Sequence, residues 1–357
     1  MEVLKKIKIP RRKLKELLQN GKESARAINL VYVNDKETGI ERIKKGKGFI
    51  YLKNGKQIKD KKELLRIRQL VIPPAWKNVW ICSRPNGHLQ ATGIDALGRK
   101  QYRYHPLWSE FRNQTKFYQL IEFGKALPCI REQLEKDLAL PGLPQEKVLA
   151  AIVTIMQHTH IRIGNGMYEK LYGSFGLTTL KDKHVSLNGS QLKFSFKGKK
   201  GVYHEITLQS RKLASIIKKC KDIPGQELFQ YYDENGERKA IDSGMVNEYI
   251  KTIGGCAFTT KDFRTWMGSV MTIEVLKEMG CCQSETEAKK KMAEALDEVA
   301  RRLGNTRAVC KKYYVHPGIL NLYINASLEN FFAEDISETP GLSATEVLLL
   351  RILQNQK

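Results

Sequence analysis

One stretch of the chain, KVLAAIVTIMQHTHIRI at residues 147–163, constrains the fold more than any other. Written as a helix it is apolar on nearly every side, and such a helix has to be buried among other elements. The neighbouring segments can supply them, because helical periodicity dominates from Pro106 onward. We therefore expect residues 107–357 to form a mainly helical domain around this buried helix.

One β segment interrupts the helical region. Alternating apolar residues in HVSL and QLKFSF flank Asn188-Gly189, and Asn-Gly between two such runs is a strong hairpin signal. A second turn, GKKG, leads into VYHEITL, which predicts a third strand. Helices resume with MVNEYIKTI and TWMGSVMTIEVLKEM. Ser284 and Glu287 then form a capping box for a helix that ends at Gly304.

The first 106 residues have a different pattern. After a basic leader and short helix over 3–26, alternating segments separated by turn-forming residues predict strands. These segments are LVYV, IERIKKGKGFIYLKNGKQI, KNVWIC and LQATGIDALGRKQYRYH, and the helix KKELLRIRQL interrupts them before Pro73-Pro74. The prediction is an α+β protein with a small β-rich domain at 1–106 and a larger helical domain at 107–357.

Charge indicates the kind of partner. The formal net charge is +23, and residues 1–70 alone hold 21 Lys/Arg against 8 Asp/Glu, whereas the last 40 residues are slightly acidic. A polyanion is the natural partner of such a chain, and DNA, RNA or a membrane surface would serve electrostatically. A basic protein with nothing more than a solvated charged face is the alternative that charge alone leaves open.

The cysteines and the apolar runs indicate the compartment. Seven cysteines occur without regular spacing or a C-x-x-C pair, which suits neither a zinc site nor a disulfide framework. No run approaches the roughly 18 apolar residues of a membrane span, and the basic N-terminus lacks the apolar region of a secretory signal. We expect a reduced protein of the cytoplasm, associated with the nucleoid if it is bacterial, and no membrane partner.

Several common signatures are absent from the sequence. There is no G-x-x-x-x-G-K-[ST] loop, so we expect no nucleotide cofactor. No Asp/Glu cluster has metal-ligand spacing, and His158 and His160 would lie about 200° apart on a helix. We therefore expect neither a metal site nor any other cofactor.

Phosphodiester chemistry without a metal requires Arg or Lys to meet the charge that develops on phosphorus, together with a nucleophile and a proton donor. Three cations stand in unusual settings. Arg162 lies at the end of the apolar helix, Lys199 lies at a hairpin tip, and Arg264 lies just before an apolar helix, oriented by Phe263 and Trp266. Each has an ordinary explanation by itself, since a hairpin-tip lysine is usually solvated and a charge beside a helix can be paired internally.

Taken together with Asn305 and Tyr314, these residues resemble in order and spacing the active-site set of the type IB DNA topoisomerases. The resemblance continues over most of the chain and fits the compact bacterial and poxvirus branch. The blocks that carry it are PPAWKNVWIC, PNGHLQATGIDALGRKQYRYHPLW, HIRIGN, GLTTLKDKHV, FKGKKG, TKDFRTW, LGNT and KKYYVHP.

The resemblance implies a role for each residue. Tyr314, rather than Tyr313, is the nucleophile that forms a 3′-phosphotyrosyl bond, because the family tyrosine directly precedes a hydrophobic-His-Pro segment. Arg162 and Arg264 hold the non-bridging oxygens, and Lys199 is the general acid, with Lys197 and Lys200 as nearby competitors. Asn305 takes the place of a histidine in the poxvirus enzymes, as in bacterial members, and donates a hydrogen bond without carrying charge.

The resemblance extends to the block GRKQYRYH of the first domain, which matches a DNA-contacting segment. Its candidates for phosphate or base contacts are Arg99, Lys100, Tyr102, Arg103 and Tyr104. An ordinary amphipathic strand with a solvated basic face is the alternative for any one of them. The family implies a monomer that clamps double-stranded DNA between its two domains.

The implied activity is relaxation of positive and negative supercoils by nicking, strand rotation and religation, without ATP or metal. A tyrosine site-specific recombinase is the nearest alternative, although recombinases usually carry His where this chain has Lys261. A non-catalytic DNA-binding protein is the other. One departure from the family is Arg307, which stands where many members have Pro, and which we expect to contact DNA or to be exposed.

Overall fold

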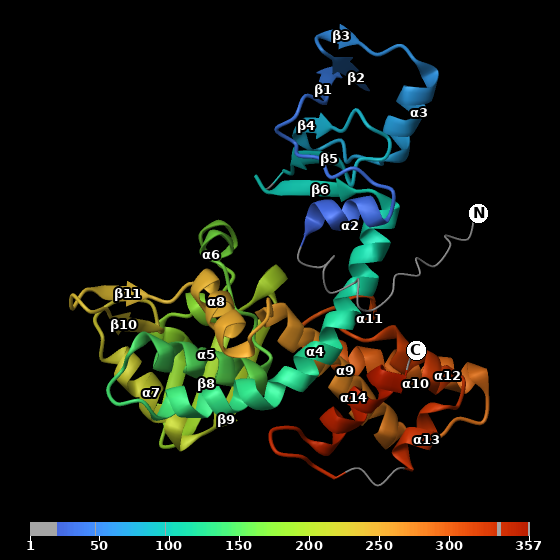
Figure 1. Cartoon of the computed structure of the whole chain (residues 1–357). Helices are drawn as coiled ribbons and strands as arrows, with labels where there is room; N and C mark the ends of the chain where they lie inside the picture. Colours follow the sequence, from blue (N-terminus) through green and yellow to red (C-terminus); the bar gives the residue numbers. More distant parts are fainter. Residues whose placement is uncertain (1–19, 47, 97, 334–336, 356–357) are drawn as a thin grey trace. The chain divides into compact units, whose positions relative to one another are not determined.

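The chain folds into two compact units, residues 1–118 and 119–357. The computed structural model describes residues 20–46, 48–96, 98–333 and 337–355, apart from the side chains of residues 114, 116, 118 and 200. Of the expected leader over 3–26, residues 3–19 therefore lie outside the described part. Helix α4 (Pro106–Ala139) begins at the predicted border between the domains and continues through the border between the units (Figure 1).

The first unit is built on one six-stranded antiparallel sheet in the order β3-β2-β1-β4-β5-β6 (Figure 1). Its strands are β1 (Ile40–Lys45), β2 (Gly48–Lys53), β3 (Lys56–Gln57), β4 (Lys77–Ile81), β5 (Leu89–Ile94) and β6 (Lys100–Tyr104). The helices of this unit are α2 (Gly21–Ala27), α3 (Lys61–Gln69) and the first part of α4. Because β6 pairs only with β5 in this order, it forms an edge of the sheet.

One core of this unit joins the middle strands of the sheet to α3. Ile40, Val79, Ile81 and Ala91 form a core cluster with Ile67 of α3. The strand that we predicted at Leu30–Val33 is wrong, because this segment makes only a single bridge between Val31 and Gly87. Its hydrogen bonds go instead to the turn before β5: Val31 N–H donates to the Asn86 carbonyl (2.9 Å), and His88 Nδ1 accepts from Val33 N–H (3.1 Å).

The second unit is mainly helical, which confirms the predicted α+β class. Its helices are the rest of α4, α5 (Gln145–Thr159), α6 (Gly166–Tyr172), α7 (Arg211–Lys221), α8 (Ser243–Gly254), α9 (Thr260–Met279), α10 (Glu285–Arg302), α11 (Arg307–Tyr313), α12 (Pro317–Ile324), α13 (Leu328–Phe332) and α14 (Ala344–Asn355). Helix α5 is buried along its length and contacts α7, α8 and α9, as its apolar sequence predicts. Among the described helices, none has the length and apolar character needed to cross a membrane.

The predicted β interruption is confirmed. Strands β7 (Val185–Asn188), β8 (Gln191–Lys197) and β9 (Tyr203–Gln209) form a three-stranded antiparallel sheet. The Asn188-Gly189 turn joins β7 to β8, and a short 3₁₀ turn η3 (Lys199–Gly201) joins β8 to β9. A separate two-stranded ribbon, β10 (Gln230–Tyr232) with β11 (Arg238–Ala240), precedes α8.

The start of α9 differs from our expectation and changes the setting of Arg264. The helix begins at Thr260, so Arg264 lies inside it rather than just before it. Asp262 Oδ2 accepts hydrogen bonds from both the N–H and the hydroxyl of Thr259, each at 2.8 Å. This Thr-x-x-Asp cap can be recognised in the sequence, and it places the start of the helix several residues closer to the N-terminus than we expected.

Helix α10 begins and ends where we expected. Ser284 Oγ accepts from Glu287 N–H (3.2 Å), and the Glu287 carboxylate accepts from Gln283 N–H (2.9 Å). The chain leaves the helix at Gly304, whose φ of +59° lies in the left-handed region that favours glycine. The next residue is Asn305, so this turn determines where its amide lies.

Candidate active site

Arg162 and Asn305 are brought together although they are 143 positions apart. Helix α5 ends where His160 adopts a left-handed conformation (φ 56°), and the chain continues in an irregular segment that carries Arg162. Arg162 Nη2 donates to the Gly304 carbonyl (2.9 Å) and to Asn305 Oδ1 (2.6 Å). The guanidinium therefore fixes the side-chain orientation of Asn305.

Arg264 is held by backbone carbonyls in the same region. It is 6% exposed, and its two terminal nitrogens donate to the carbonyls of His160 and Leu303 (Nη2 to Leu303 O, 2.8 Å). These acceptors belong to the ends of α5 and α10, the same two segments that present Arg162 and Asn305. Three distant parts of the sequence therefore meet at the two arginines.

Tyr314 directly follows α11 and lies beside Arg264, with the guanidinium carbon 5.2 Å from the phenol ring centroid. Its backbone rests on α9, where a Cβ at Gly268 would come within 2.6 Å of the Tyr314 carbonyl oxygen. Tyr313 is 37% exposed, with the Lys312 ammonium 5.4 Å from its ring centroid. The structure thus places Tyr314, rather than Tyr313, next to the buried arginine.

Lys199 lies in the turn η3 and is exposed. Its ammonium is 6.0 Å from the ring centroid of Tyr168 on α6. Lys199 also lines a small cavity together with Arg162, so the hairpin turn and the first arginine face the same space. Of its competitors, Lys197 is the last residue of β8 and exposed, and the side chain of Lys200 lies outside the described part.

Two buried donors at this place lack protein partners. Among the residues that the structure describes, Arg264 Nε and Asn305 Nδ2 are buried atoms without a hydrogen-bond acceptor. A buried donor left unpaired costs about 1–3 kcal/mol, and such groups are rare in folded proteins. Both are donors beside the Tyr314 ring and the Arg162 guanidinium, as a site for phosphoryl oxygens requires.

The electrostatics of the cluster formed by Arg162, Lys199, Arg264, Asn305 and Tyr314 favour an anion. Burial, and then the positive charge of Arg264, lowers the pKa of Arg162 to about 10. Burial also lowers the pKa of Arg264. Within the described residues neither guanidinium has a carboxylate at ion-pair distance, so both charges stay uncompensated at neutral pH. A bound phosphate would relieve the repulsion between them.

The candidates in the first unit have a different environment. Arg99 pairs with Asp95 (2.6 Å), Lys100 pairs with Asp35 (2.5 Å), and Arg103 donates to the Val71 carbonyl (2.9 Å). The two tyrosines of β6 stack on one another with centroids 6.0 Å apart and remain exposed; they are Tyr102 and Tyr104. The stacked phenols are therefore the part of this block most open to a ligand.

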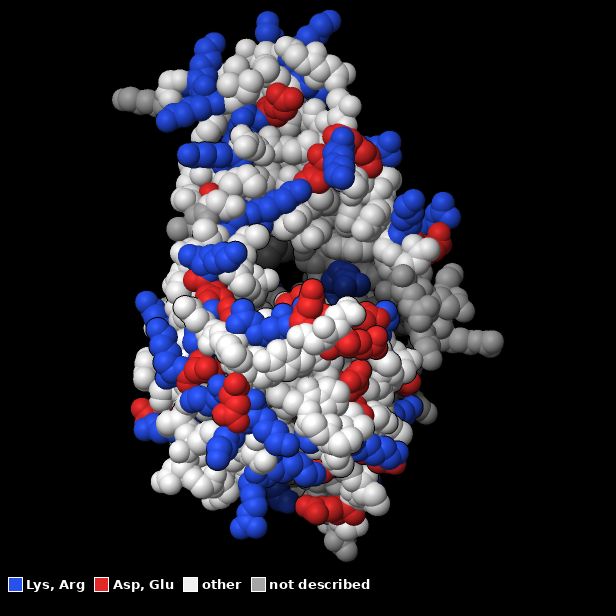
Figure 2. Space-filling model, turned by 90° about the vertical axis from the view of Figure 1, so that its left-hand side faces the viewer, with Lys and Arg blue, Asp and Glu red and all other residues white. Residues whose placement is uncertain are grey.

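Arg307 is exposed and bound to a carboxylate. Its Nε donates to Asp297 Oδ1 (2.6 Å), and Nη2 donates to Asp297 Oδ2. The contact joins the first turn of α11 to α10. On the face drawn in Figure 2, Asp and Glu side chains stand among those of Lys and Arg. The exposed pair of Arg307 with Asp297 is a compensated surface charge.

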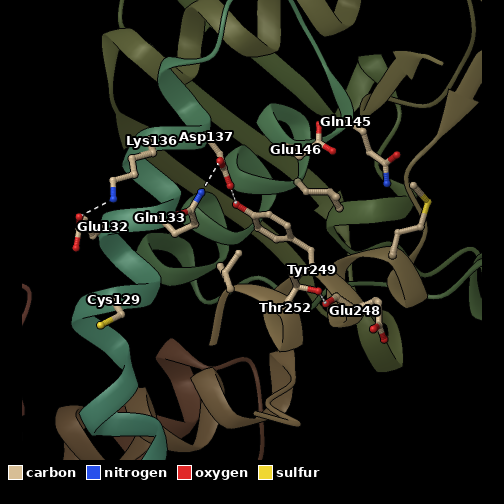
Figure 3. A pocket seen from close by; sticks show the side chains of 13 residues that line it. Cys129, Glu132, Gln133, Lys136, Asp137, Gln145, Glu146, Glu248, Tyr249 and Thr252 are labelled. Atoms are coloured by element: carbon tan, nitrogen blue, oxygen red, sulfur yellow. Dashed lines mark hydrogen bonds and ion pairs between the residues drawn. The ribbon is translucent and has the colours of Figure 1, made fainter. Parts of the chain in front are cut away.

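A larger cavity, of about 810 Å³, shares no residue with this cluster. It is lined by α4, α5 and α8, and four of its lining residues are acidic (Glu132, Asp137, Glu146 and Glu248; Figure 3). Asp137 is occupied by a hydrogen bond from the Tyr249 hydroxyl (2.5 Å). An acidic lining repels phosphate, so this cavity is not the candidate active site although it is the larger of the two. Nowhere in the described residues are three His, Cys, Asp or Glu side chains grouped to bind a metal.

Our sequence reasoning missed His204 of β9. Its imidazole lines the small cavity with Arg162 and Lys199 and packs against the glycines that precede Lys199 and Asn305. The predicted strand VYHEITL held a signal, because antiparallel pairing places His204 opposite the buried Phe196. The carbonyls that hold Arg264 could not have been found, since they depend on the tertiary fold.

Two family descriptions match the chain. Residues 106–329 match "Eukaryotic DNA topoisomerase I, catalytic core", and residues 48–95 match "Bacterial DNA topoisomerase IB, N-terminal domain". The first match contains all five residues of the cluster, namely Arg162, Lys199, Arg264, Asn305 and Tyr314. The second contains most of the sheet in the first unit but ends before β6.

Individual relatives agree with these matches. The DNA topoisomerase 1B of Acanthamoeba polyphaga mimivirus is 33% identical over 328 residues, which cover 89% of this chain and 95% of the relative. The DNA topoisomerase 1B of Vaccinia virus (strain Western Reserve) is 26% identical over 235 residues, 64% of this chain and 71% of the relative. The DNA topoisomerase 1 of Rabbit fibroma virus is 23% identical over 237 residues, 64% and 70% of the two chains.

Proposed function

The chain belongs to the type IB DNA topoisomerases, and from that membership we propose that Arg162, Lys199, Arg264, Asn305 and Tyr314 carry out its strand cutting and rejoining. The protein is an isomerase that acts on double-stranded DNA and relaxes it. Its family excludes the recombinase that the spacing of Arg, Lys and Tyr left open. The roles of the five residues are the proposal.

In the proposed reaction, Tyr314 Oη attacks the phosphorus of one strand while the phenol proton passes to water. The bond between phosphorus and the 5′ oxygen breaks, and Lys199 Nζ gives its proton to that oxygen. The products are a 3′-phosphotyrosyl bond and a free 5′-hydroxyl, which can rotate about the intact strand. Religation is the reverse step, and since one phosphoester replaces another, no nucleotide is consumed.

One observation supports this proposal most strongly: the buried Arg264 lies beside the Tyr314 ring, the half-buried Arg162 lies in the same region, and neither has a carboxylate partner among the described residues. The unpaired donors Arg264 Nε and Asn305 Nδ2 fit the same purpose, because a pentacoordinate phosphorus needs donors that are fixed before the charge develops. Arg162 binds the Asn305 side chain through Oδ1, which leaves the amide nitrogen free to donate.

The proposal includes the partner and the number of chains. One chain supplies all five groups, so a monomer suffices for catalysis, with no nucleotide and no metal ion. The exposed stacked pair Tyr102 and Tyr104 contacts DNA from the first unit, because phenols can meet both sugar and base edges. Arg99 and Lys100 contribute less than their charge suggests, since each already binds an aspartate.

The test is relaxation of supercoiled plasmid in EDTA without ATP. We expect the wild type to remove positive and negative supercoils, and Tyr314→Phe to bind DNA with near-normal affinity but not to relax it. Tyr313→Phe is the matched control, because it removes a neighbouring hydroxyl from an exposed ring, and it should relax DNA normally. Relaxation by Tyr314→Phe would refute the assignment of the nucleophile.

A further inference from the structure

His204 occupies the space between two segments that carry candidate catalytic groups. It is the second residue of β9, and its ring stacks on Phe196 of β8, with centroids 5.2 Å apart and an interplanar angle of 24°. Phe196 is buried, so this contact anchors one face of the imidazole to the core of the unit. The ring is therefore a fixed object rather than a mobile surface group.

The edge of this ring lies against two backbones. A Cβ at Gly198 would be 2.5 Å from His204 Cδ2 and 2.6 Å from Nε2, and a Cβ at Gly304 would be 2.7 Å from Cε1. No side chain could occupy either place without moving the ring. Gly198 directly precedes Lys199 and Gly304 directly precedes Asn305, so the imidazole separates these two segments by its own width.

Lys199 needs such a support. Its long side chain has many rotamers, and its backbone lies in the short turn η3 rather than in a strand or long helix. The turn is closed by hydrogen bonds from Gly198 N–H to Val202 O (2.7 Å) and from Gly201 N–H to Gly198 O (3.1 Å), which fix its shape. His204 fixes where this turn lies relative to Arg162, which lines the same cavity.

The imidazole of His204 is uncharged. Burial, and then the positive charges of Arg162 and Arg264, lowers the pKa of His204 below its ordinary value, so the ring is neutral at pH 7. A neutral ring can fill the gap between two cationic segments without adding to their repulsion. A lysine or arginine of similar length at this position would add to that repulsion.

We propose that His204 is a positioning residue, which places Lys199 Nζ at the leaving 5′ oxygen by holding Gly198 away from Gly304. The inference rests on the proposed role of Lys199 as general acid. Proton transfer requires hydrogen-bond reach to the leaving oxygen, and a displacement of about 1 Å can cost roughly a hundredfold in rate. His204 should therefore affect the proton-transfer part of the reaction and leave the attack by Tyr314 intact.

The experiment uses two duplexes that differ in one atom. In one the leaving group at the scissile phosphate is the natural 5′ oxygen, and in the other it is sulfur. A thiolate leaves without a proton, so the sulfur duplex does not require a general acid. Single-turnover cleavage by the full chain is measured on both duplexes at saturating enzyme.

We expect His204→Ala to cleave the oxygen duplex about 10- to 100-fold more slowly than the wild type, and the sulfur duplex within about threefold of it. Gly198→Ala should show the same pattern, because its φ of −90° suits alanine and only the contact with the ring is disturbed. His88→Ala is the matched control: His88 also stacks on an aromatic ring (Tyr32, ring centroids 4.2 Å apart) but does not line this cavity, so the ratio of the two rates should stay unchanged.

Each outcome decides one statement. If His204→Ala slows both duplexes equally, or neither, the inference is wrong. Lys199→Ala tests the role on which the inference rests: if sulfur does not rescue this variant, Lys199 is not the general acid and the proposed function needs revision. If sulfur rescues Lys199→Ala but not His204→Ala, only the role of His204 is refuted.

Discussion

The two candidate catalytic arginines of the second unit are held in the opposite way from Arg99 and Lys100 of the first unit. In the second unit, Arg264 is buried and Arg162 is half-buried, and both donate to neutral oxygens, those of backbone carbonyls and of Asn305. In the first unit, Arg99 and Lys100 lie near the surface and bind carboxylates at 2.6 Å and 2.5 Å. Carbonyls orient a cation without cancelling its charge, whereas carboxylates cancel it.

This difference separates two uses of positive charge. An oriented and uncompensated guanidinium can stabilise charge that develops during a reaction, because it needs no reorganisation when the reaction occurs. A compensated surface cation has to exchange one anion for another, so it adds little to affinity and is screened by salt. The net charge of +23 therefore says less about catalysis than the settings of Arg162 and Arg264 do.

The largest effect is expected at Arg264. Arg264→Ala should slow single-turnover cleavage by about 100- to 1000-fold, or about 3–4 kcal/mol in the barrier, because a preorganised donor set is lost. Arg264→Lys keeps the charge but loses the planar fork, so its cleavage rate should lie between those of the wild type and Arg264→Ala. Cleavage of an end-labelled duplex at saturating enzyme measures the rate.

Arg307→Ala is the control for this comparison, since Arg307 belongs to the same unit but binds Asp297 at the surface. It should cleave at nearly the wild-type rate. A thermal melt of each variant checks folding, because Arg264→Ala also leaves two carbonyls without their donor. Equal rates for Arg264→Ala and Arg307→Ala would remove the distinction between buried and compensated cations.

A medium effect is expected from pH, through His160. Burial, and then the charge of Arg264, lowers the pKa of His160 to about 4. Below about pH 6.5 the histidine of the unfolded chain, whose pKa is ordinary, takes up a proton that His160 in the folded protein does not. The free energy of unfolding is therefore highest above that pH and falls as the pH is lowered toward 4. For this one group the loss is about 2 kcal/mol between pH 7 and pH 5.

His160→Asn should reduce the pH dependence, since asparagine does not titrate and tolerates the left-handed φ of 56° at this position. Urea unfolding of both proteins at pH 7 and pH 5 gives the difference. If the wild type and His160→Asn lose the same free energy of unfolding between pH 7 and pH 5, protonation of His160 is not the cause of the pH dependence.

The smallest effect is expected in the first unit. Lys100→Ala should weaken DNA binding by less than about tenfold and leave single-turnover cleavage at saturating DNA unchanged, because Asp35 already compensates the ammonium. Asp35→Asn should strengthen binding and steepen its salt dependence, since it frees Lys100 for a phosphate. Fluorescence anisotropy over a salt series measures both, and a large loss of cleavage rate in Lys100→Ala would contradict the comparison.

Local chemistry explains what the sequence could predict of the fold. The Asn188-Gly189 hairpin, the buried α5 and the cap at Ser284 each depend on neighbouring residues, and all three are confirmed. The start of α9 was misplaced because the cap of Thr259 with Asp262 was overlooked, although it too is local. The strand expected at Leu30–Val33 failed because its partners are a turn and a histidine side chain rather than another strand.

The candidate site, like the fold, was predictable only in part. The five residues could be selected by their order in the sequence, but their contacts could not. Arg162 reaches Asn305 across 143 positions, and Arg264 reaches carbonyls at the ends of two other helices. His204 escaped notice because its importance depends on two glycines that lie far apart in the sequence.

We expect Tyr314, which lies beside the uncompensated Arg264, to form the covalent bond to DNA. The most direct measurement traps the reaction on a labelled duplex with denaturant, digests the protein and identifies the modified peptide. We predict a 3′-linked adduct on Tyr314 in the wild type and in Tyr313→Phe, and no adduct in Tyr314→Phe. An adduct on Tyr313, or an adduct that persists in Tyr314→Phe, would show that Tyr314 is not the nucleophile.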